Sequence, residues 1–157
     1  MSAEDNLNSF LDEQLMRIAI LEANKSLFDV PVGALIVSPS GEILAKSHNF
    51  SEEDNDILGH AEIRVIKRVT TILGTRRLSD CSIYVTLEPC PLCAMLIREA
   101  QICRLVFGAW NKKSGGAGSK YDLLRDKGMG TNEVEVKGGI LETECATLLT
   151  KFFGGKR

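Results

Sequence analysis

Apolar and polar positions follow two periods along this chain, one typical of helices and one typical of strands. Residues 9–25 carry apolar side chains at helical spacing, which predicts a first helix that stops before Pro31. The apolar stretch 32–37 predicts a buried strand and residues 42–47 a second strand, and a Pro-Ser-Gly turn between them indicates a hairpin. The chain is therefore predicted to open with a helix and a β-hairpin.

Both periods recur through the remaining residues. Further helices are predicted at 60–73, 90–100 and 141–153, with a short one near 121–125. Further strands are predicted at 82–86, 103–109 and 134–136, and polar loops at 51–58 and 111–120. Strands that alternate with helices indicate an α/β fold in which helices cover both faces of one sheet. We therefore expect residues 1–157 to form a single domain, a three-layer α/β/α sandwich with a mixed sheet of about five strands.

The composition is that of an ordinary globular protein. Apolar residues make up 44% of the 157 residues and charged residues 25%. The longest uncharged run, 30–41, contains two prolines and is too short to span a bilayer, so no membrane association is expected. The first residues are acidic and polar, unlike a signal peptide, and we therefore expect a cytoplasmic location.

The cysteines do not fit a disulfide framework. The chain has five, and an odd number without a secretion signal argues against paired cysteines. Cys81, Cys103 and Cys145 lie in stretches of apolar or small residues, so we expect them to be buried thiols. Cys90 and Cys93 stand in a different pattern, Pro-Cys-Pro-Leu-Cys.

Charge is distributed unevenly between the two parts of the chain. The formal net charge is −2, but residues 1–62 carry −9 and residues 63–157 carry +7. A basic second part favours a polyanionic partner. An uneven but simply solvated surface would give the same sums, so charge alone leaves both interpretations open.

A metal site is predicted from His60, Cys90 and Cys93. Two cysteines three residues apart at a helix start face the same side, and the positive end of the helix favours thiolates. His60 begins another predicted helix and supplies a third ligand. Three ligands of imidazole and thiolate type suit a catalytic zinc, which keeps its fourth position for water.

The main alternative is a structural zinc, which would need a fourth protein ligand such as Cys81 or Cys103. Neither of these cysteines belongs to a CxxC pair. The chain has only one other histidine, His48, which we expect not to bind the metal.

Glu62 completes the predicted site. Residues i and i+2 diverge within a helix, so His60 and Glu62 can line one cavity only at a helix end, which is where the sequence places them. A carboxylate beside a catalytic zinc can take a proton from water and deliver one to a leaving nitrogen. H-x-E combined with P-C-x-x-C is the signature of zinc deaminases, in which the glutamate is the general acid and base.

Several longer motifs resemble the bacterial tRNA-specific adenosine deaminases, a branch of the cytidine deaminase-like superfamily. The resemblance runs from about residue 12 to the C-terminus. The motifs are Asp29-Val30-Pro31-Val32-Gly33-Ala34, His48-Asn49, His60-Ala61-Glu62, Tyr84-Val85-Thr86-Leu87-Glu88-Pro89-Cys90, Phe107-Gly108-Ala109, Gly116-Ala117-Gly118-Ser119, Glu144-Cys145-Ala146 and Phe152-Phe153.

This resemblance implies conversion of the wobble adenosine of a tRNA anticodon to inosine. It implies a homodimer with one Zn²⁺ per subunit, a tRNA anticodon stem-loop as partner, and no role for DNA. Substrate contacts are implied for Asn49, Ala61, Asn111 and Phe152. We expect at least one of Phe152 and its neighbour Phe153 to anchor the last helix in the core.

The chain departs from the family at Ile57-Leu58-Gly59 and at Trp110-Asn111, both near the expected substrate contacts. Two other functions therefore stay open. One is a deaminase of a free base or nucleoside, of the cytosine or guanine type. The other is a non-catalytic RNA-binding protein with a structural zinc, against which the presence of Glu62 argues.

Overall fold

The computed structural model describes residues 1–51, 55–130 and 132–154. These residues form four α-helices, one short 3₁₀ helix and five strands. The helices are α1 (Ala3–Ala23), α2 (Ala61–Leu73), α3 (Pro91–Glu99) and α4 (Glu142–Gly154), with the 3₁₀ helix η1 at Lys127–Met129. The strands are β1 (Gly33–Val37), β2 (Ile43–His48), β3 (Ser82–Leu87), β4 (Arg104–Ala109) and β5 (Glu135–Lys137).

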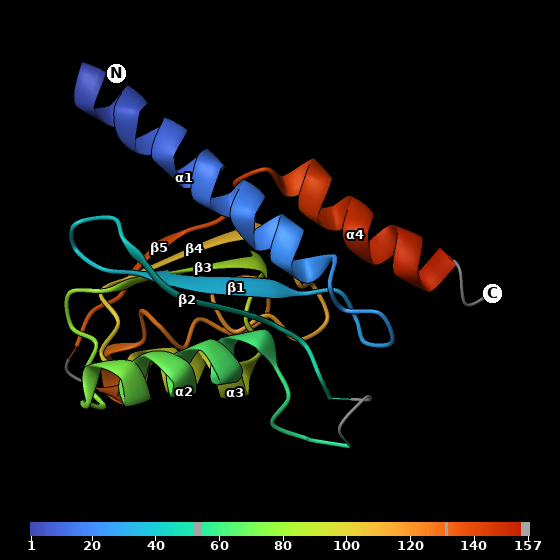
Figure 1. Ribbon diagram of the computed structural model, residues 1–157. Helices are drawn as coiled ribbons and strands as arrows, with labels where there is room; N and C mark the ends of the chain where they lie inside the picture. Colours follow the sequence, from blue (N-terminus) through green and yellow to red (C-terminus); the bar gives the residue numbers. More distant parts are fainter. Residues whose placement is uncertain (52–54, 131, 155–157) are drawn as a thin grey trace.

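The strands form one mixed sheet in the order β2-β1-β3-β4-β5. Strand β1 runs antiparallel to both β2 and β3, whereas β3, β4 and β5 are parallel to one another. Helices α1 and α4 cover one face of the sheet, and α2 and α3 cover the other (Figure 1). The three-layer α/β/α sandwich with a mixed sheet is therefore confirmed.

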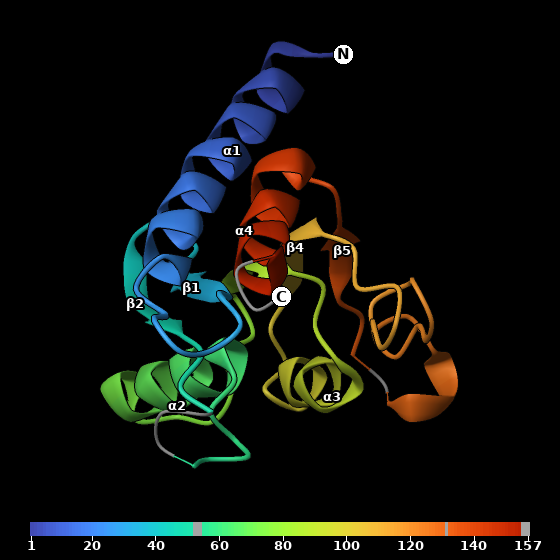
Figure 2. The same ribbon diagram turned by 90° about the vertical axis from the view of Figure 1, so that its right-hand side faces the viewer.

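Alternation along the strands produces a core on each face of the sheet. In β1, Ala34 and Ile36 belong to the core shared with α2 and α3, whereas Leu35 and Val37 belong to the core shared with α1 and α4. Parallel strands buried on both faces are expected to be apolar throughout, as β4 is in Leu105 to Phe107. This arrangement leaves the helix N-termini of α2 and α3 on the same side of the sheet, next to one another (Figure 2).

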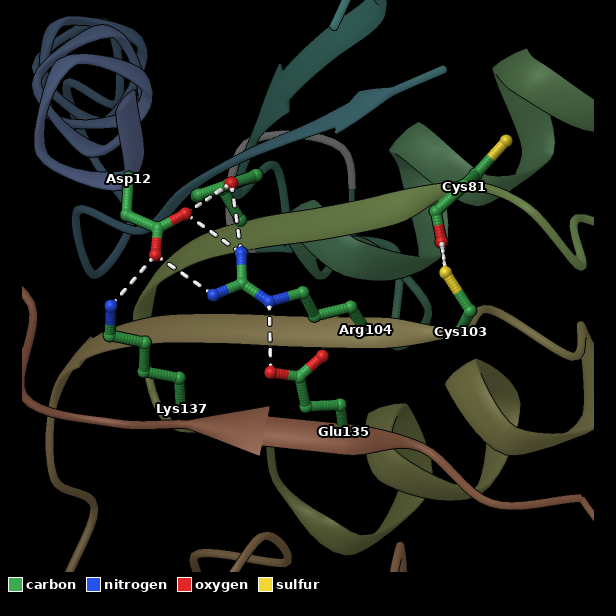
Figure 3. Close-up of polar contacts among 7 residues, drawn as sticks. Asp12, Cys81, Cys103, Arg104, Glu135 and Lys137 are labelled. Atoms are coloured by element: carbon green, nitrogen blue, oxygen red, sulfur yellow. Dashed lines mark hydrogen bonds and ion pairs between the residues drawn. The ribbon is translucent and has the colours of Figure 1, made fainter. Parts of the chain in front are cut away.

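A buried carboxylate fastens α1 to the sheet. The side chain of Asp12 accepts hydrogen bonds from Tyr84 on β3 at 2.6 Å and from Arg104 on β4 at 2.7 and 2.9 Å. The ammonium group of Lys137 on β5 is 2.9 Å from the same carboxylate (Figure 3). One acidic residue of α1 therefore links the helix to three neighbouring strands.

The predictions for the start of α1, for residues 121–125 and for Cys103 were wrong. Helix α1 begins at Ala3 and not near residue 9, because Ser2 and Asp5 form a capping box that the apolar period does not reveal. No helix forms at 121–125, where Gly118 and Leu123 donate backbone hydrogen bonds to Tyr121 and Gly116 and hold the segment in turns. The 3₁₀ helix η1 follows this segment instead.

The third error concerns Cys103, which is exposed, whereas Cys81 and Cys145 are buried as expected. The Cys103 thiol donates to the carbonyl oxygen of Cys81 at 3.1 Å, and the Cys81 thiol points away from it (Figure 3). All five cysteines are free. None of the described helices is long and apolar enough to cross a membrane.

Candidate active site

A cavity of about 470 Å³ opens where β3 ends and α2 and α3 begin. Its wall contains residues from the loop after α1, the end of β2, the starts of α2 and α3, the segment after β4, and α4. These residues are Phe28, Asp29, Val30, Val32, Asn49, Ser51, His60, Glu62, Leu87, Glu88, Cys90, Asn111, Ser114, Phe152 and Phe153. Segments distant in sequence thus meet at one edge of the sheet, as is usual for ligand sites in open α/β folds.

Two helix starts bring His60, Cys90 and Cys93 together. His60 is the N-cap residue of α2 and Cys90 is the N-cap residue of α3, both with extended backbone. Pro91 occupies the first turn of α3, where its missing N–H costs no hydrogen bond. Cys93 lies one turn into the helix, on the same side as Cys90.

The spacing of these side chains fits a tetrahedral zinc ion. The Nδ1 atom of His60 is 3.7 Å from the Cys90 sulfur and 3.4 Å from the Cys93 sulfur. A zinc with ordinary Zn–N and Zn–S bonds places nitrogen and sulfur about 3.5 Å apart. All three candidate ligand atoms lie within 4.8 Å of one another. The donor set and the distances therefore both suit Zn²⁺.

The pKa values of the two thiols are shifted in opposite directions. The hydrogen bond from Cys93 is the largest cause that lowers the pKa of Cys90 to about 4, and His60 adds to it. The same hydrogen bond raises the pKa of Cys93, and burial raises it further. Cys90 is therefore a thiolate at neutral pH even before a metal binds, which favours metal capture.

Glu62 is buried in the first turn of α2 and lines the cavity beside His60. Burial is the main cause that raises its pKa above the usual value for a glutamate. A carboxylate can accept a proton, and a raised pKa makes it hold that proton more tightly than an ordinary glutamate does. His60 and Glu62 therefore line one cavity at the start of α2.

Asn49 and Ala61 form one hydrogen-bonded unit at the cavity wall. The side-chain oxygen of Asn49 accepts from the Ala61 N–H at 2.8 Å, and its amide nitrogen donates to the Val30 carbonyl at 3.0 Å. Asn49 lines the cavity, but Ala61 is fully buried and is not among the lining residues. Within this structure Ala61 therefore fixes the orientation of Asn49 through its backbone.

The remaining predicted substrate residues, Asn111 and Phe152, also line the cavity. Phe152 is half-buried and packs edge-on against Phe153, with the ring centroids 5.3 Å apart. The prediction that one of these two rings anchors the last helix in the core was wrong, because Cys145, Ala146 and Leu149 make the core contacts of α4. Phe153 is 54% exposed, and Phe28, which also lines the cavity, is 63% exposed. Two solvent-facing aromatic rings thus belong to the cavity wall, where they can stack on a flat ligand.

His48 lies outside the His-Cys-Cys group. Its Nδ1 atom is 3.0 Å from a carboxylate oxygen of Glu22 on α1, and its ring packs against Phe50. Trp110, one of the departures from the family, packs edge-on against Phe107 and does not line the cavity.

Sequence reasoning missed Phe28 and Glu88 as residues of this site. Phe28 is an exposed aromatic between a helix and a proline, a position with no periodic signal. Glu88 is a charged residue at the end of an otherwise apolar strand, directly before Pro89-Cys90, and this could have marked it. It is 1% exposed and lines the cavity.

Comparisons with known proteins agree with this geometry. Residues 10–109 match the family described as the cytidine and deoxycytidylate deaminase zinc-binding region. The tRNA-specific adenosine deaminase of Bacillus subtilis is 41% identical over 144 residues, which cover 90% of this chain and 88% of that protein.

Two solved structures are also similar. One comes from studies of A-to-I editing by tRNA:A34 deaminases at the wobble position of transfer RNA; it is 37% identical, with a TM-score of 0.82 over 87% of this chain and 99% of the other. The guanine deaminase of Bacillus subtilis is 30% identical, with a TM-score of 0.62 over 71% of this chain and 72% of the other. The chain therefore belongs to the cytidine and deoxycytidylate deaminase zinc-binding family, and within it to the tRNA-specific adenosine deaminases.

Proposed function

We propose that this protein hydrolyses the wobble adenosine of a tRNA anticodon to inosine, with release of ammonia. The observation that carries this proposal is the buried carboxyl group of Glu62 in one cavity with His60 and Cys90, which form a group of metal-ligand atoms with Cys93. Similarity to tRNA-specific adenosine deaminases over 90% of the chain favours adenosine in RNA over other substrates. The basic second part of the chain fits a polyanionic partner.

We assign His60, Cys90 and Cys93 as the ligands of one zinc ion. Their donor atoms and separations suit tetrahedral coordination with one position left for a non-protein ligand. Zinc bound in such a site supplies Lewis-acid chemistry and makes water a competent nucleophile at neutral pH.

In this proposal Glu62 moves the protons of the reaction. Its carboxylate accepts a proton from the attacking water as the water oxygen bonds to C6 of adenine. The same carboxyl group then donates this proton to the exocyclic nitrogen as the C6–N bond breaks and ammonia leaves. The second proton of the water passes from the C6 hydroxyl to N1, so the product has a carbonyl oxygen at C6 and an N1–H. Burial of Glu62 keeps bulk water away from this exchange and supports both halves of the transfer.

The cavity wall offers contacts for a base that has left its stack. A base must be flipped out of the anticodon loop before its amino group can reach the site. The exposed rings of Phe28 and Phe153 are placed to stack on the base or its neighbours, and Asn49 and Asn111 present side chains to the cavity. We propose these four residues, together with Phe152, as the substrate contacts.

We further propose a homodimer with one zinc per subunit, in which each subunit is one deaminase domain over 1–157. All four helices pack on one sheet, which supports a single domain. Large apolar side chains exposed on α2 and α3 (Ile72, Leu73 and Leu92) support burial against a second copy. Light scattering at micromolar concentration tests the dimer: a mass of one chain would contradict it.

We also propose a cytoplasmic location, because the proposed substrate is a tRNA.

A free purine is the second candidate substrate, because a guanine deaminase shares the fold at 30% identity. The test is to incubate the zinc-loaded protein separately with an anticodon stem-loop that bears a wobble adenosine, with guanine, with cytosine and with free adenosine. A stem-loop with guanosine at the wobble position is the matched control. Inosine in the adenosine stem-loop alone supports the proposal, and ammonia from a free base alone would contradict it.

A further inference from the structure

We propose that Glu88 is a positioning residue that clamps the segment 111–119 against the turn that carries Cys90, and so shapes the substrate side of the cavity. This inference rests on the proposed function for the identity of the substrate. The clamp itself is a property of the fold, and it can be measured without a substrate.

Both oxygens of the Glu88 carboxylate accept hydrogen bonds from this segment. Oε1 accepts from the backbone N–H of Asn111 at 3.1 Å and from the hydroxyl group of Ser119. Oε2 accepts from the backbone N–H groups of Ala117 at 3.1 Å and Ser119 at 3.0 Å. One side chain therefore holds both ends of the segment.

Backbone hydrogen bonds continue the clamp into the turn before α3. The N–H of Glu88 donates to the carbonyl oxygen of Ala109 at 2.8 Å, and the N–H of Gly116 donates to the carbonyl oxygen of Pro89 at 2.7 Å. Figure 2 shows the chain after β4 folding back beside α3. Glu88 thus lies between the turn of Cys90 and the loop, and it contacts both.

The clamped segment carries part of the cavity wall. Asn111 and Ser114 line the cavity, and they are bonded to each other: the Asn111 amide donates to the Ser114 hydroxyl at 3.1 Å and its oxygen accepts the Ser114 N–H at 3.2 Å. The hydrogen bond from the Asn111 N–H to Glu88 fixes this pair relative to Cys90. Loss of the clamp would therefore move Asn111 and Ser114 without changing either residue.

Gly115 shows how closely the segment approaches the carboxylate. A Cβ atom at position 115 would collide with the Glu88 carboxylate and with the Asn111 carbonyl oxygen, which are fixed groups. Only glycine has room there. The contact between Glu88 and the segment therefore depends on two residues. Glu88 is the buried hydrogen-bond acceptor, and Gly115 has no side chain that would block the approach.

A carboxylate suits this role because it only accepts hydrogen bonds. Each oxygen of Glu88 faces donors, so a glutamine would turn an –NH₂ group towards N–H or O–H groups on one side. Both oxygens are occupied by the segment, so we place Glu88 outside the chemical step even though it lines the cavity. Its effect on the reaction passes through Asn111 and Ser114.

The experiment compares Glu88→Gln with Glu42→Gln, a matched change at an exposed glutamate on the turn between β1 and β2. Lys112, Lys113 and Lys120 are exposed and flank or lie in the clamped segment, so limited trypsin digestion reports its opening. Loss of hydrogen bonds to a buried charged group should raise the rate of cleavage at these lysines roughly 10- to 100-fold. The zinc content of Glu88→Gln should equal that of the wild type.

In steady-state kinetics we expect KM for the wobble adenosine stem-loop to rise about tenfold or more in Glu88→Gln, with a smaller change in kcat. A residue that only stabilised the fold would not separate these two constants. Cleavage rates and KM equal to those of Glu42→Gln would overturn the inference.

Two further variants keep the test decisive if Glu88→Gln loses its zinc. Ser119→Ala removes one donor and Gly115→Ala pushes the segment outward, and both leave residue 88 in place. Faster cleavage and a higher KM in both, with zinc retained, support the clamp; wild-type values in both refute it. If the wild type deaminates no RNA, the proposed function fails, but the trypsin comparison still decides the clamp.

Discussion

Replacement of Asp12 by asparagine should destabilise the protein although Asp12 lies far from the cavity in the fold. The Asp12 side chain is 2% exposed and accepts hydrogen bonds from Tyr84, Arg104 and Lys137 on three strands (Figure 3). An asparagine keeps the shape but loses the charge, and its –NH₂ group must face a donor. Lys137 would then lose the carboxylate that it pairs with, and Arg104 would keep only the exposed carboxylate of Glu135, 3.5 Å away.

The expected loss in the free energy of unfolding can be calculated in two ways. Burial raises the pKa of Asp12, but hydrogen bonds from Arg104, Tyr84 and Lys137 outweigh it and lower the pKa from 3.8 to about 2. This fall corresponds to about 2 kcal/mol in favour of the charged form. Removal of one partner of a fully buried ion pair costs about 3–5 kcal/mol. Arg104 and Lys137 are 20% and 35% exposed, which reduces that cost, so we expect a loss of about 2–3 kcal/mol.

Urea denaturation at pH 7, at one protein concentration and with equal zinc loading, measures this loss. Glu13→Gln, a change of the same kind on the same helix, is the control and should alter the free energy of unfolding by less than about 0.5 kcal/mol. If Asp12→Asn and Glu13→Gln unfold at the same urea concentration, the anchoring role of Asp12 is refuted.

The pH dependence gives a second check. The folded-state pKa of Asp12 lies below its unfolded value, so its contribution is complete above about pH 4 and is lost as the pH falls towards about 2. The difference in stability between the wild type and Asp12→Asn should therefore shrink across this range. Release of zinc at low pH affects both proteins and cancels in the difference. A difference that stays constant down to pH 2 would show that the charge is not its source.

Three further changes test the site. Glu62→Gln should keep zinc and lower kcat about 10²- to 10⁴-fold, measured by inosine formation alongside metal analysis; full activity would exclude the proton-transfer role. Cys90→Ala should lose most of its zinc, whereas Cys103→Ala, at an exposed thiol, should keep it; equal zinc content in the two variants would contradict the ligand assignment. Phe153→Ala should raise KM for the stem-loop by roughly 5- to 100-fold through lost stacking, and an unchanged KM would remove this ring from the substrate contacts.

The layered fold was predictable because it depends on short-range periodicity. The continuous apolar run of β1 and the helical spacing in α2 can be recognised without knowledge of the partners. The end of α2 was equally clear, because Gly74 adopts the left-handed conformation (φ 65°) that glycine tolerates best. Errors arose where a capping interaction or a network of turns decides the structure, as at Ser2 and at 121–125.

The metal group was predictable for a different reason. His60, Cys90 and Cys93 belong to residue types with few other uses in such a pattern, and their spacing at helix starts constrains the geometry. Phe28 carries no such signal, and Glu88 carries only a weaker one, its charge at the end of an apolar strand. They join the site only because the fold brings residues 28, 88 and 111–119 to one edge of the sheet, and that approach depends on tertiary contacts.

The central claim is that Glu62 and the His-Cys-Cys group carry out hydrolysis of the wobble adenosine. Its most direct test is a reaction of the zinc-loaded protein with the adenosine stem-loop in ¹⁸O-labelled water, followed by nuclease digestion and mass spectrometry of the nucleosides. We predict inosine that carries the solvent oxygen in the wild type, and unmodified adenosine in Glu62→Gln with the same zinc content. Absence of inosine in the wild type, or labelled inosine at the wild-type rate in Glu62→Gln, would contradict the account.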